Sequence, residues 1–490
     1  FRSILNNWRS ILNNWPKSTL TMILNTPSFL IALASLPLGV LTLKALWKLR
    51  RNSFPTVPCD PSRVVVGNAL EFAGENPRDY LVSRHRKYGP LLSVDLISYR
   101  AISVGDTELV KQILFAPLKT FVPGYDEVWK YYEDIGVSLI GFGGEQWRTE
   151  RQAFTPALLR DGPVKTMFPL FVKHIEEALT KWSCGVSNVW AIDQELKLVA
   201  IKIILEVAFG KTVEGVNGGT AVLKNVEVIM SEVERRMSSL VHLWRIMPTI
   251  YSIPYNRSVR ALVQLADNII TARLSGKDPV KDDVLEHMLI SYKEGTFPYE
   301  RLRANVIGVL IGGFDTSSSV MTMAVHSLAN HPDVQRKAIE EVDRVLGGAT
   351  PTYEDLDRLP YLTAVINETI RLYAPAFIVS RKTTGEYKLG DVTLPPNTMV
   401  FMAFAYMQTD PNIWGTDSDE FRPERMLGDT NSEQKSLLSQ SFLPFSAGMR
   451  MCPGRMVAML EMRTVLAMLL QKFELAPVTG HEKVKMGVRL

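Results

Sequence analysis

The sequence FSAGMRMCPG, Phe445–Gly454, surrounds the most informative cysteine of this chain. Cys452 stands just before an apolar segment, 456–473, that has the composition of a helix. A thiol at a helix N-terminus meets free backbone N–H groups and the positive end of the helix dipole, both of which favour the thiolate. Gly448 permits a tight turn, and Arg450 offers a rigid fork of donors to a carboxylate. This combination suits a haem iron together with a haem propionate, whereas the commoner fate of a free cysteine is a buried structural position.

The composition of the whole chain limits the classes of protein to consider. The 490 residues are 46% apolar and 22% charged, which is typical of a folded globular chain and excludes a mainly disordered one. Lysine and arginine total 55 against 51 acidic residues, and this mild net charge of +4 gives no case for a nucleic-acid-binding protein. With only 3 cysteines, the others being Cys59 and Cys184, neither a disulfide framework nor a cysteine-rich zinc module is expected.

The residues around Cys452 match a family pattern. Phe445, Gly448, Arg450, Cys452 and Gly454 occupy every fixed position of F-x-x-G-x-R-x-C-x-G. The stretch therefore resembles the haem-binding loop of the cytochrome P450 superfamily. The resemblance implies that Cys452 is the axial ligand of the iron in haem b (iron protoporphyrin IX), and that Gly448 and Gly454 shape the loop around it. It also implies that Arg450 binds a haem propionate and that Phe445 packs near the thiolate.

A glutamate and two arginines upstream give a second match. Glu368 and Arg371 lie three residues apart in a predicted helix, so their side chains share one helix face and can pair. In isolation such a pair is more commonly an exposed ion pair of little energetic weight. Together with Arg425 in the segment FRPERM, the resemblance instead implies a buried structural cluster rather than a catalytic one. Ala458 and Glu461 extend the match of the cysteine loop into the predicted helix that follows it.

The predicted long helix Arg303–Asn330 contains an unusual polar cluster, Gly312–Ser317. Two adjacent glycines weaken a helix by about 1 kcal/mol each relative to alanine, and unpartnered buried polar groups are costly. One explanation is a close helix crossing that the glycines permit, with Thr316 bonded to its own turn. The other, implied by the resemblance, is the oxygen-binding groove of the family. Thr316 and Asp315 would then be catalytic, serving oxygen binding and proton delivery.

Three further residues are assigned to haem binding only through the resemblance. Trp147 and Arg151 form a W-x-x-x-R motif whose family counterpart contacts a propionate, although an amphipathic surface helix gives the same pattern. Arg381 follows the predicted helix of Glu368 and resembles another propionate-binding arginine. With Arg450, three cations would face two carboxylates, an arrangement suited to charge-assisted hydrogen bonds.

Apolar residues near these motifs are candidates for the wall of a substrate pocket, with ordinary core packing as the alternative for each. The candidates are Phe121, Tyr125, Trp129, Val309, Gly312, Phe314, Phe377, Ile378 and Val379. An apolar pocket predicts a lipophilic substrate, which could be a fatty acid, a sterol, a terpenoid or a xenobiotic.

The N-terminal region predicts a membrane anchor. Ser18–Leu43 carries no charge and is long enough to cross the ~30 Å of bilayer hydrocarbon. Basic residues follow it between positions 44 and 51, which places the remainder of the chain on the cytosolic side; the alternatives are a cleaved signal peptide and a buried core helix. Prolines at positions 55, 58 and 61 predict a stiff hinge. The heptapeptide RSILNNW occurs twice in 2–15, which we interpret as a local duplication or an artefact.

Helical patterns outnumber strand patterns from residue 63 onward, and no linker interrupts them. We predict a mainly α protein with small β-sheets (α+β), with the cytochrome P450 fold that the resemblance implies. The predicted parts are an N-terminal segment at 1–17, a transmembrane anchor at 18–47, a basic, proline-rich hinge at 48–66 and one haem-thiolate catalytic domain at 67–490. Expected elements are a turn at Asn76–Tyr80 with a helix running on to Tyr88, a hairpin formed by 91–97 and 101–106, and helices at Asp193–Phe209, Arg303–Asn330 and Leu359–Tyr373.

The resemblance implies a haem-thiolate monooxygenase, which adds one oxygen atom of O₂ to its substrate and converts the other to water. Because the sequence shows no flavin or nicotinamide motif, we expect electrons from a partner protein. The resemblance implies that this partner is NADPH-cytochrome P450 reductase, with cytochrome b5 as a second donor, at the endoplasmic reticulum membrane. Arg455 and Arg463 are either contacts for an acidic partner or solvated surface charges. Two alternatives remain: a family member that rearranges or dehydrates peroxides without O₂, and a non-enzymatic haem protein.

Overall fold

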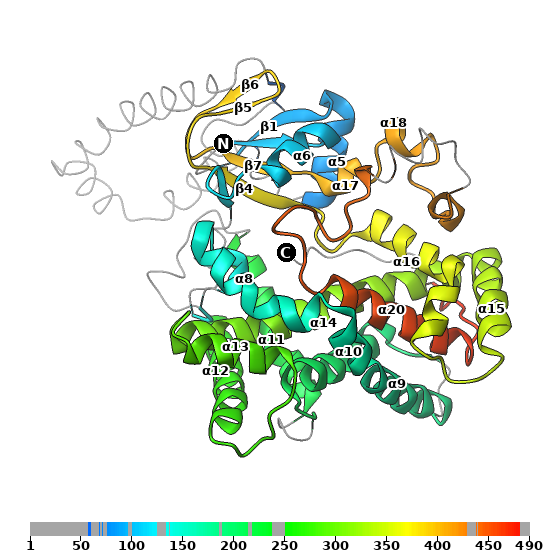
Figure 1. The fold of residues 1–490 in the computed structure, drawn as a ribbon. Coiled ribbons are helices and arrows are strands. Elements are labelled where there is room, and N and C mark those ends of the chain that lie inside the picture. The colour runs from blue at the N-terminus through cyan, green and yellow to red at the C-terminus, as the bar shows by residue number, and fades with distance from the viewer. Residues whose placement is uncertain are drawn as a thin grey trace, which may run out of the picture.

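The computed structural model describes residues 57–59, 68, 71, 76–96, 100–124, 134–136, 138–185, 189–213, 218–237, 250–428, 438 and 440–480 (Figure 1). The predicted N-terminal segment, the anchor at 18–47 and nearly all of the hinge at 48–66 lie outside these residues, as do the pocket candidates Tyr125 and Trp129. The described residues form many helices and small sheets, which is the mainly α class that the sequence predicts.

The elements have the following bounds. The α-helices are α5 Pro77–Tyr88, α6 Thr107–Phe115, α8 Gly144–Leu158, α9 Asp161–Ser183, α10 Ile192–Phe209, α11 Gly219–Met237, α12 Ser252–Leu274, α13 Val284–Lys293, α14 Tyr299–Asn330, α15 Pro332–Leu346, α16 Pro360–Tyr373, α17 Phe404–Met407, α18 Pro411–Trp414 and α20 Arg455–Leu470. The 3₁₀ turns are η1 Leu139–Gly141, η4 Glu354–Arg358 and η5 Pro423–Met426. The strands are β1 Leu91–Asp95, β2 Arg100–Val104, β3 Phe121–Pro123, β4 Val379–Thr383, β5 Tyr387–Leu389, β6 Val392–Leu394 and β7 Met399–Met402.

A sheet in the order β1-β2-β7-β4-β3 lies to one side of the helices (Figure 1). β1 and β2 form the predicted hairpin and pair antiparallel, with Leu91 opposite Val104. β7 joins β2 in parallel and β4 in antiparallel pairing, so strands from distant parts of the chain share this sheet. Helix α6 covers the sheet through apolar side chains that pack on those of β2 and β7.

Several helix ends follow the predicted stop signals. α10 ends where predicted because Gly210 adopts the left-handed conformation, with φ at 64°, and its N–H donates to the Glu206 carbonyl at 3.0 Å. α16 ends where predicted because Ala374 precedes a proline and leaves the helical region, with ψ at 122°. α14 ends at Asn330, before Pro332, as expected.

Two predicted boundaries differ from the structure by more than two residues. α14 begins at Tyr299 rather than Arg303, because its first turn is polar and carries Glu300, so apolar periodicity does not reveal it. The predicted turn at 76–80 is in fact the start of helix α5. Asn76 is its N-cap, and the Asn76 side chain accepts a hydrogen bond from the Arg78 N–H.

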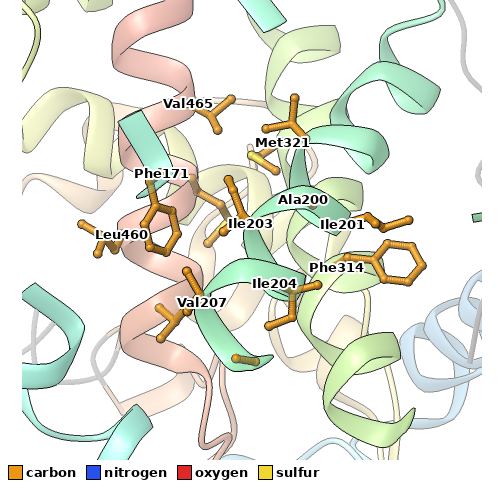
Figure 2. Packing of buried hydrophobic residues seen from close by; sticks show 14 of the residues in the cluster. Phe171, Ala200, Ile201, Ile203, Ile204, Val207, Phe314, Met321, Leu460 and Val465 are labelled. Carbon is orange, nitrogen blue, oxygen red and sulfur yellow. The ribbon is translucent and has the colours of Figure 1, made fainter. Parts of the chain in front are cut away.

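The main core forms where α9, α10, α14 and α20 pack together (Figure 2). Side chains labelled there are Phe171, Ala200, Ile201, Ile203, Ile204, Val207, Phe314, Met321, Leu460 and Val465. Among the described helices, α14 alone is long and apolar enough to span a membrane. Half of its most apolar stretch is buried inside the protein, as in the central helix of a domain. This core holds α14, which carries Gly312–Ser317, against α20, which follows Cys452.

Candidate functional site

The loop 445–454 turns tightly in front of α20. The Cys452 N–H donates to the Phe445 carbonyl at 3.0 Å and closes the loop. Gly448 has φ at 70°, in the left-handed region that favours glycine, and a Cβ there would lie 2.4 Å from the Leu114 carbonyl oxygen. The loop therefore needs glycine at this position both for its backbone conformation and for its close approach to the end of α6.

The Cys452 thiol lies at the N-terminus of α20, which begins at Arg455. Desolvation raises the pKa of the thiol, whereas a hydrogen bond from the Gly454 backbone and the charges of Arg151 and Arg455 act in the opposite direction. A metal ion bound to such a sulfur displaces its proton, and the nearby positive groups then stabilise the thiolate. The arrangement is that of a single soft ligand for a metal.

Two arginines and a tryptophan lie beside this loop. The Arg450 guanidinium lies 4.6 Å from the centre of the Trp147 ring, and Arg450 Nη2 donates to the Ile140 carbonyl at 3.1 Å. Arg151 Nη2 donates to the Met451 carbonyl at 2.7 Å. Trp147 is only 4% exposed, so α8 is not a surface helix on this face. Residues from two separate motifs thus meet next to the cysteine.

One face at the centre of α14 is open. Gly312 and Thr316 are exposed although nearly all of the helix is at least partly buried, and a Cβ at Gly312 would have no atom within 4 Å. Thr316 Oγ1 donates to the Gly312 carbonyl at 3.0 Å, and Asp315 beside it is half-buried. A Cβ at Gly313, in contrast, would lie 2.5 Å from Ile204 of α10. Both explanations of the polar cluster therefore have support: Gly313 permits a close helix crossing, and Gly312 and Thr316 border open space.

Glu368, Arg371 and Arg425 form a buried ionic cluster. Arg371 Nε and Nη2 each donate to the Glu368 carboxylate at 2.8 Å, and Arg425 Nε donates to Glu368 Oε1 at 2.8 Å. Arg371 Nη1 also donates to the carbonyls of Gln408 and Ser418, at 2.7 and 2.6 Å. The cluster joins α16 to η5 and to the chain before it, which is a structural arrangement.

These groups fit the cofactor that the sequence implies. The loop would supply one sulfur ligand for iron, Arg151 and Arg450 beside it would supply donors for carboxylates, and Gly312 borders open space. A family model described as Cytochrome P450 matches residues 57–487. The chain belongs to the cytochrome P450 family.

Known relatives match this P450 along most of their length. Cytochrome P450 CYP72A616 of Paris polyphylla is 29% identical over 78% of this chain and 75% of its own. Methyltetrahydroprotoberberine 14-monooxygenase of Papaver somniferum is 26% identical over 93% of this chain and 92% of its own. Cyclooctat-9-en-7-ol 5-monooxygenase of Streptomyces melanosporofaciens is 27% identical over 80% and 84%. The protein is thus an oxygen-incorporating oxidoreductase, and its family implies a haem held by a cysteine thiolate.

Arg381 of this P450 lies in the sheet, whose apolar cluster also packs against Ala447 of the cysteine loop. It belongs to β4, where it pairs with Val400 of β7 and Pro123 of β3. Its side chain is buried, and Nη1 donates to the Ser380 carbonyl at 2.9 Å. The assignment of Arg381 to a propionate stays a prediction.

The pocket candidates divide into core and open positions. Phe121 and Phe377 are buried in clusters around the sheet. Phe314 is fully buried in the main core (Figure 2), because it lies two residues, or about 200° of helix rotation, from the open Gly312. Half-buried positions next to these clusters are Val309, Ile378 and Val379. The three phenylalanines are buried, as the alternative of core packing expects, and Gly312 is the one exposed residue among the candidates that the structure describes. The assignment of these residues to a pocket wall stays a prediction.

Three buried polar residues of this region received no functional role from the sequence. Glu461 is 2% exposed on α20, and desolvation raises its pKa to about 8 although a hydrogen bond with Ser317 acts in the opposite direction. Glu150 and Asn305 are each 1% exposed and bonded to one another. For Glu461, the sequence does contain a signal, an acidic residue among the apolar residues of α20. For Glu150 and Asn305 it contains none, because the two residues lie on different helices and no local sequence pattern pairs them.

Proposed function

We propose that this P450 is a haem-thiolate monooxygenase that inserts one atom of O₂ into a lipophilic substrate, which is a fatty acid, a sterol, a terpenoid or a xenobiotic. The main support is the open face formed by Gly312 and Thr316, with Asp315 beside it, in a chain that also presents Cys452 at the start of α20. When bound, the haem supplies the activation of O₂, and the thiolate ligand increases the electron density on iron.

Five residues are proposed to hold the haem. Cys452 Sγ is the iron ligand, and the N-terminus of α20 stabilises its negative charge. Arg450 and Arg151 bind propionates through charge-assisted hydrogen bonds, with the Trp147 ring against their guanidinium groups. Arg381 contributes a third cation from the sheet.

Asp315 and Thr316 are proposed to deliver protons at the open face of α14. Turning the Thr316 hydroxyl away from the Gly312 carbonyl costs about one hydrogen bond, ~0.5–1.5 kcal/mol, and presents its proton to the open space. Asp315 then resupplies the proton from the adjacent position. A peroxide-rearranging enzyme needs neither residue, so this pair favours the monooxygenase.

Electrons are proposed to come from NADPH-cytochrome P450 reductase, with cytochrome b5 as a second donor, at the endoplasmic reticulum membrane. Arg463 is already paired with Asp357 at 3.0 Å. Arg455, exposed at the start of α20, is therefore the better candidate for an acidic partner surface. The predicted anchor at 18–47 is what supports the membrane location.

Turnover with ¹⁸O₂ tests the reaction class. With reductase and NADPH, the product should carry one labelled oxygen and the second should appear in water. Thr316→Ala should keep consuming NADPH but release peroxide in place of product. Ser319→Ala is the matched control, since Ser319 Oγ also bonds within its own turn, to the Asp315 carbonyl at 2.7 Å. Product without label, or full coupling in Thr316→Ala, would favour the peroxide-rearranging alternative.

A spectral binding screen tests the substrate class. Fatty acids, sterols, terpenoids and apolar xenobiotics are titrated in turn against the oxidised holoprotein. Saturable spectral changes with one of these classes identify the substrate family. The absence of a response to every apolar compound, with a response to polar ones, would contradict a lipophilic substrate.

A further inference from the structure

The short turn η1 lies between the cysteine loop and α14. On one side, its Ile140 carbonyl accepts the hydrogen bond from Arg450 Nη2 at 3.1 Å. On the other side, its Leu139 N–H donates to Asn305 Oδ1 of α14 at 2.8 Å. A single turn of backbone therefore connects an arginine of the cysteine loop with the helix that carries the open face.

Asn305 is itself fixed by a buried carboxylate. Its Nδ2 donates to Glu150 Oε2 at 3.2 Å, and Arg301, one helical turn earlier, donates to Glu150 Oε1 at 2.7 Å. The Arg301 guanidinium also lies 4.4 Å from the centre of the Phe142 ring, directly after η1. Because its oxygen faces a donor and its nitrogen faces an acceptor, only one orientation of the Asn305 amide satisfies both contacts.

The chain before η1 approaches α14 closely. A Cβ at Gly308 would lie 2.9 Å from the Ser138 Cβ, so only glycine allows this distance. Residues 301, 305, 308 and 312 of α14 follow the spacing of one helix face. The face that holds η1 therefore continues directly into the open face at Gly312.

We propose that Glu150 and Asn305 are positioning residues that hold η1 against α14, and that η1 in turn holds Arg450 in place to bind a haem propionate. The proposal rests on the proposed function, because it takes Arg450 to be a propionate ligand. Glu150 and Arg151 are neighbours on α8, so one part of this helix serves both the network on α14 and the cysteine loop.

Asn305→Leu tests the proposal because it keeps the side-chain volume and removes both hydrogen bonds. Amide hydrogen exchange at Leu139 should accelerate about tenfold, the effect expected for one buried hydrogen bond. Haem release from the holoprotein to excess apomyoglobin should also accelerate about tenfold. Glu150→Gln is the milder variant, because its amide still accepts from Asn305 but loses the charge that pairs with Arg301. For it we expect roughly a threefold acceleration of both processes.

Gln335→Leu on α15 is the matched control. Gln335 is 3% exposed, accepts from the Leu475 N–H at 2.7 Å and donates to the Leu328 carbonyl at 3.1 Å. Like Asn305, it is a buried amide that ties a helix to distant backbone. Its loss should destabilise the fold but leave exchange at η1 and the haem release rate unchanged.

The Arg450→Ala background separates positioning from general weakening. Arg450→Ala alone should accelerate haem release, and adding Asn305→Leu should change the rate by less than about twofold, because both act through one contact. The proposal is overturned by unchanged exchange at η1, by full additivity of the two variants, or by equal acceleration in Gln335→Leu. The single variant Arg450→Ala tests the proposed function separately, because its Asn305 is intact. If it releases haem at the wild-type rate, Arg450 does not bind a propionate, and the proposed link between Asn305 and haem binding is overturned with it.

Discussion

Replacing Glu461 with glutamine should make the folded protein increasingly more stable than the wild type as the pH rises. Glu461 lies on α20 with 2% exposure, and its Oε1 has no hydrogen-bond partner among the described residues. Desolvation raises its pKa from 4.5 to about 8, and the hydrogen bond with Ser317 opposes this shift without cancelling it. The carboxyl is therefore protonated in the folded protein at neutral pH.

The magnitude follows from the difference in bound protons. Below about pH 4.5 the carboxyl is protonated in both the folded and unfolded states, and its stabilising contribution is fully present. Between there and about pH 8 the folded protein keeps a proton that the unfolded chain has lost, so the free energy of unfolding falls by about 1.4 kcal/mol per pH unit. Over the whole interval the wild type loses about 5 kcal/mol of unfolding free energy through this carboxyl. The Glu461→Gln variant does not lose it, because its amide does not titrate.

Urea unfolding of the holoprotein, followed by circular dichroism from about pH 5 to about pH 8, measures this difference. The unfolding free energy of Glu461→Gln minus that of wild type should rise steadily with pH. Thr464→Ser, a buried change on the same helix without a titratable group, should differ from wild type by a constant amount. A constant difference for Glu461→Gln would refute the buried, neutral carboxyl, because it would mean that the carboxyl is ionised in both the folded and unfolded states over this pH range.

Further substitutions test the packing around the site. Glu368→Gln leaves two buried guanidinium groups without their anion and should cost about 3–5 kcal/mol of unfolding free energy; Glu340→Gln, in an exposed pair, should cost less than about 1 kcal/mol. Gly313→Ala should lower the thermal midpoint through a clash worth about 1–3 kcal/mol, whereas Gly312→Ala should keep or raise it and alter peroxide release instead. Gly448→Ala should lower the bound haem per protein, measured by absorbance, because its Cβ has no room and its φ is strained.

The features that the sequence predicts best are local. The turn of the loop around Cys452 is closed within ten positions, by the hydrogen bond from the Cys452 N–H to the Phe445 carbonyl, and the positive φ of Gly448 suits its residue type. The pairing of Glu368 with Arg371 follows from helix geometry. The third partner, Arg425, could be assigned only through the family pattern, because its contact joins distant segments.

Distant contacts limit what the sequence can tell. α14 is surrounded by other helices, so apolar periodicity does not distinguish the buried face of Phe314 from the open face of Gly312. Asn305 and Glu150 meet across 155 positions of sequence, and no local pattern pairs them. Such contacts form only when the helices pack together, so the sequence predicts neither the residues of the pocket wall nor the hydrogen bonds around η1.

Reduction of the purified holoprotein under carbon monoxide tests the central claim, thiolate ligation of the haem iron by Cys452, most directly. The wild type should show the strongly red-shifted Soret band of a thiolate-ligated haem. Cys184→Ala, at the exposed cysteine that ends α9, should keep this band, and Cys452→Ala should lack it. A red-shifted band that persists in Cys452→Ala would contradict the assignment of Cys452 as the iron ligand.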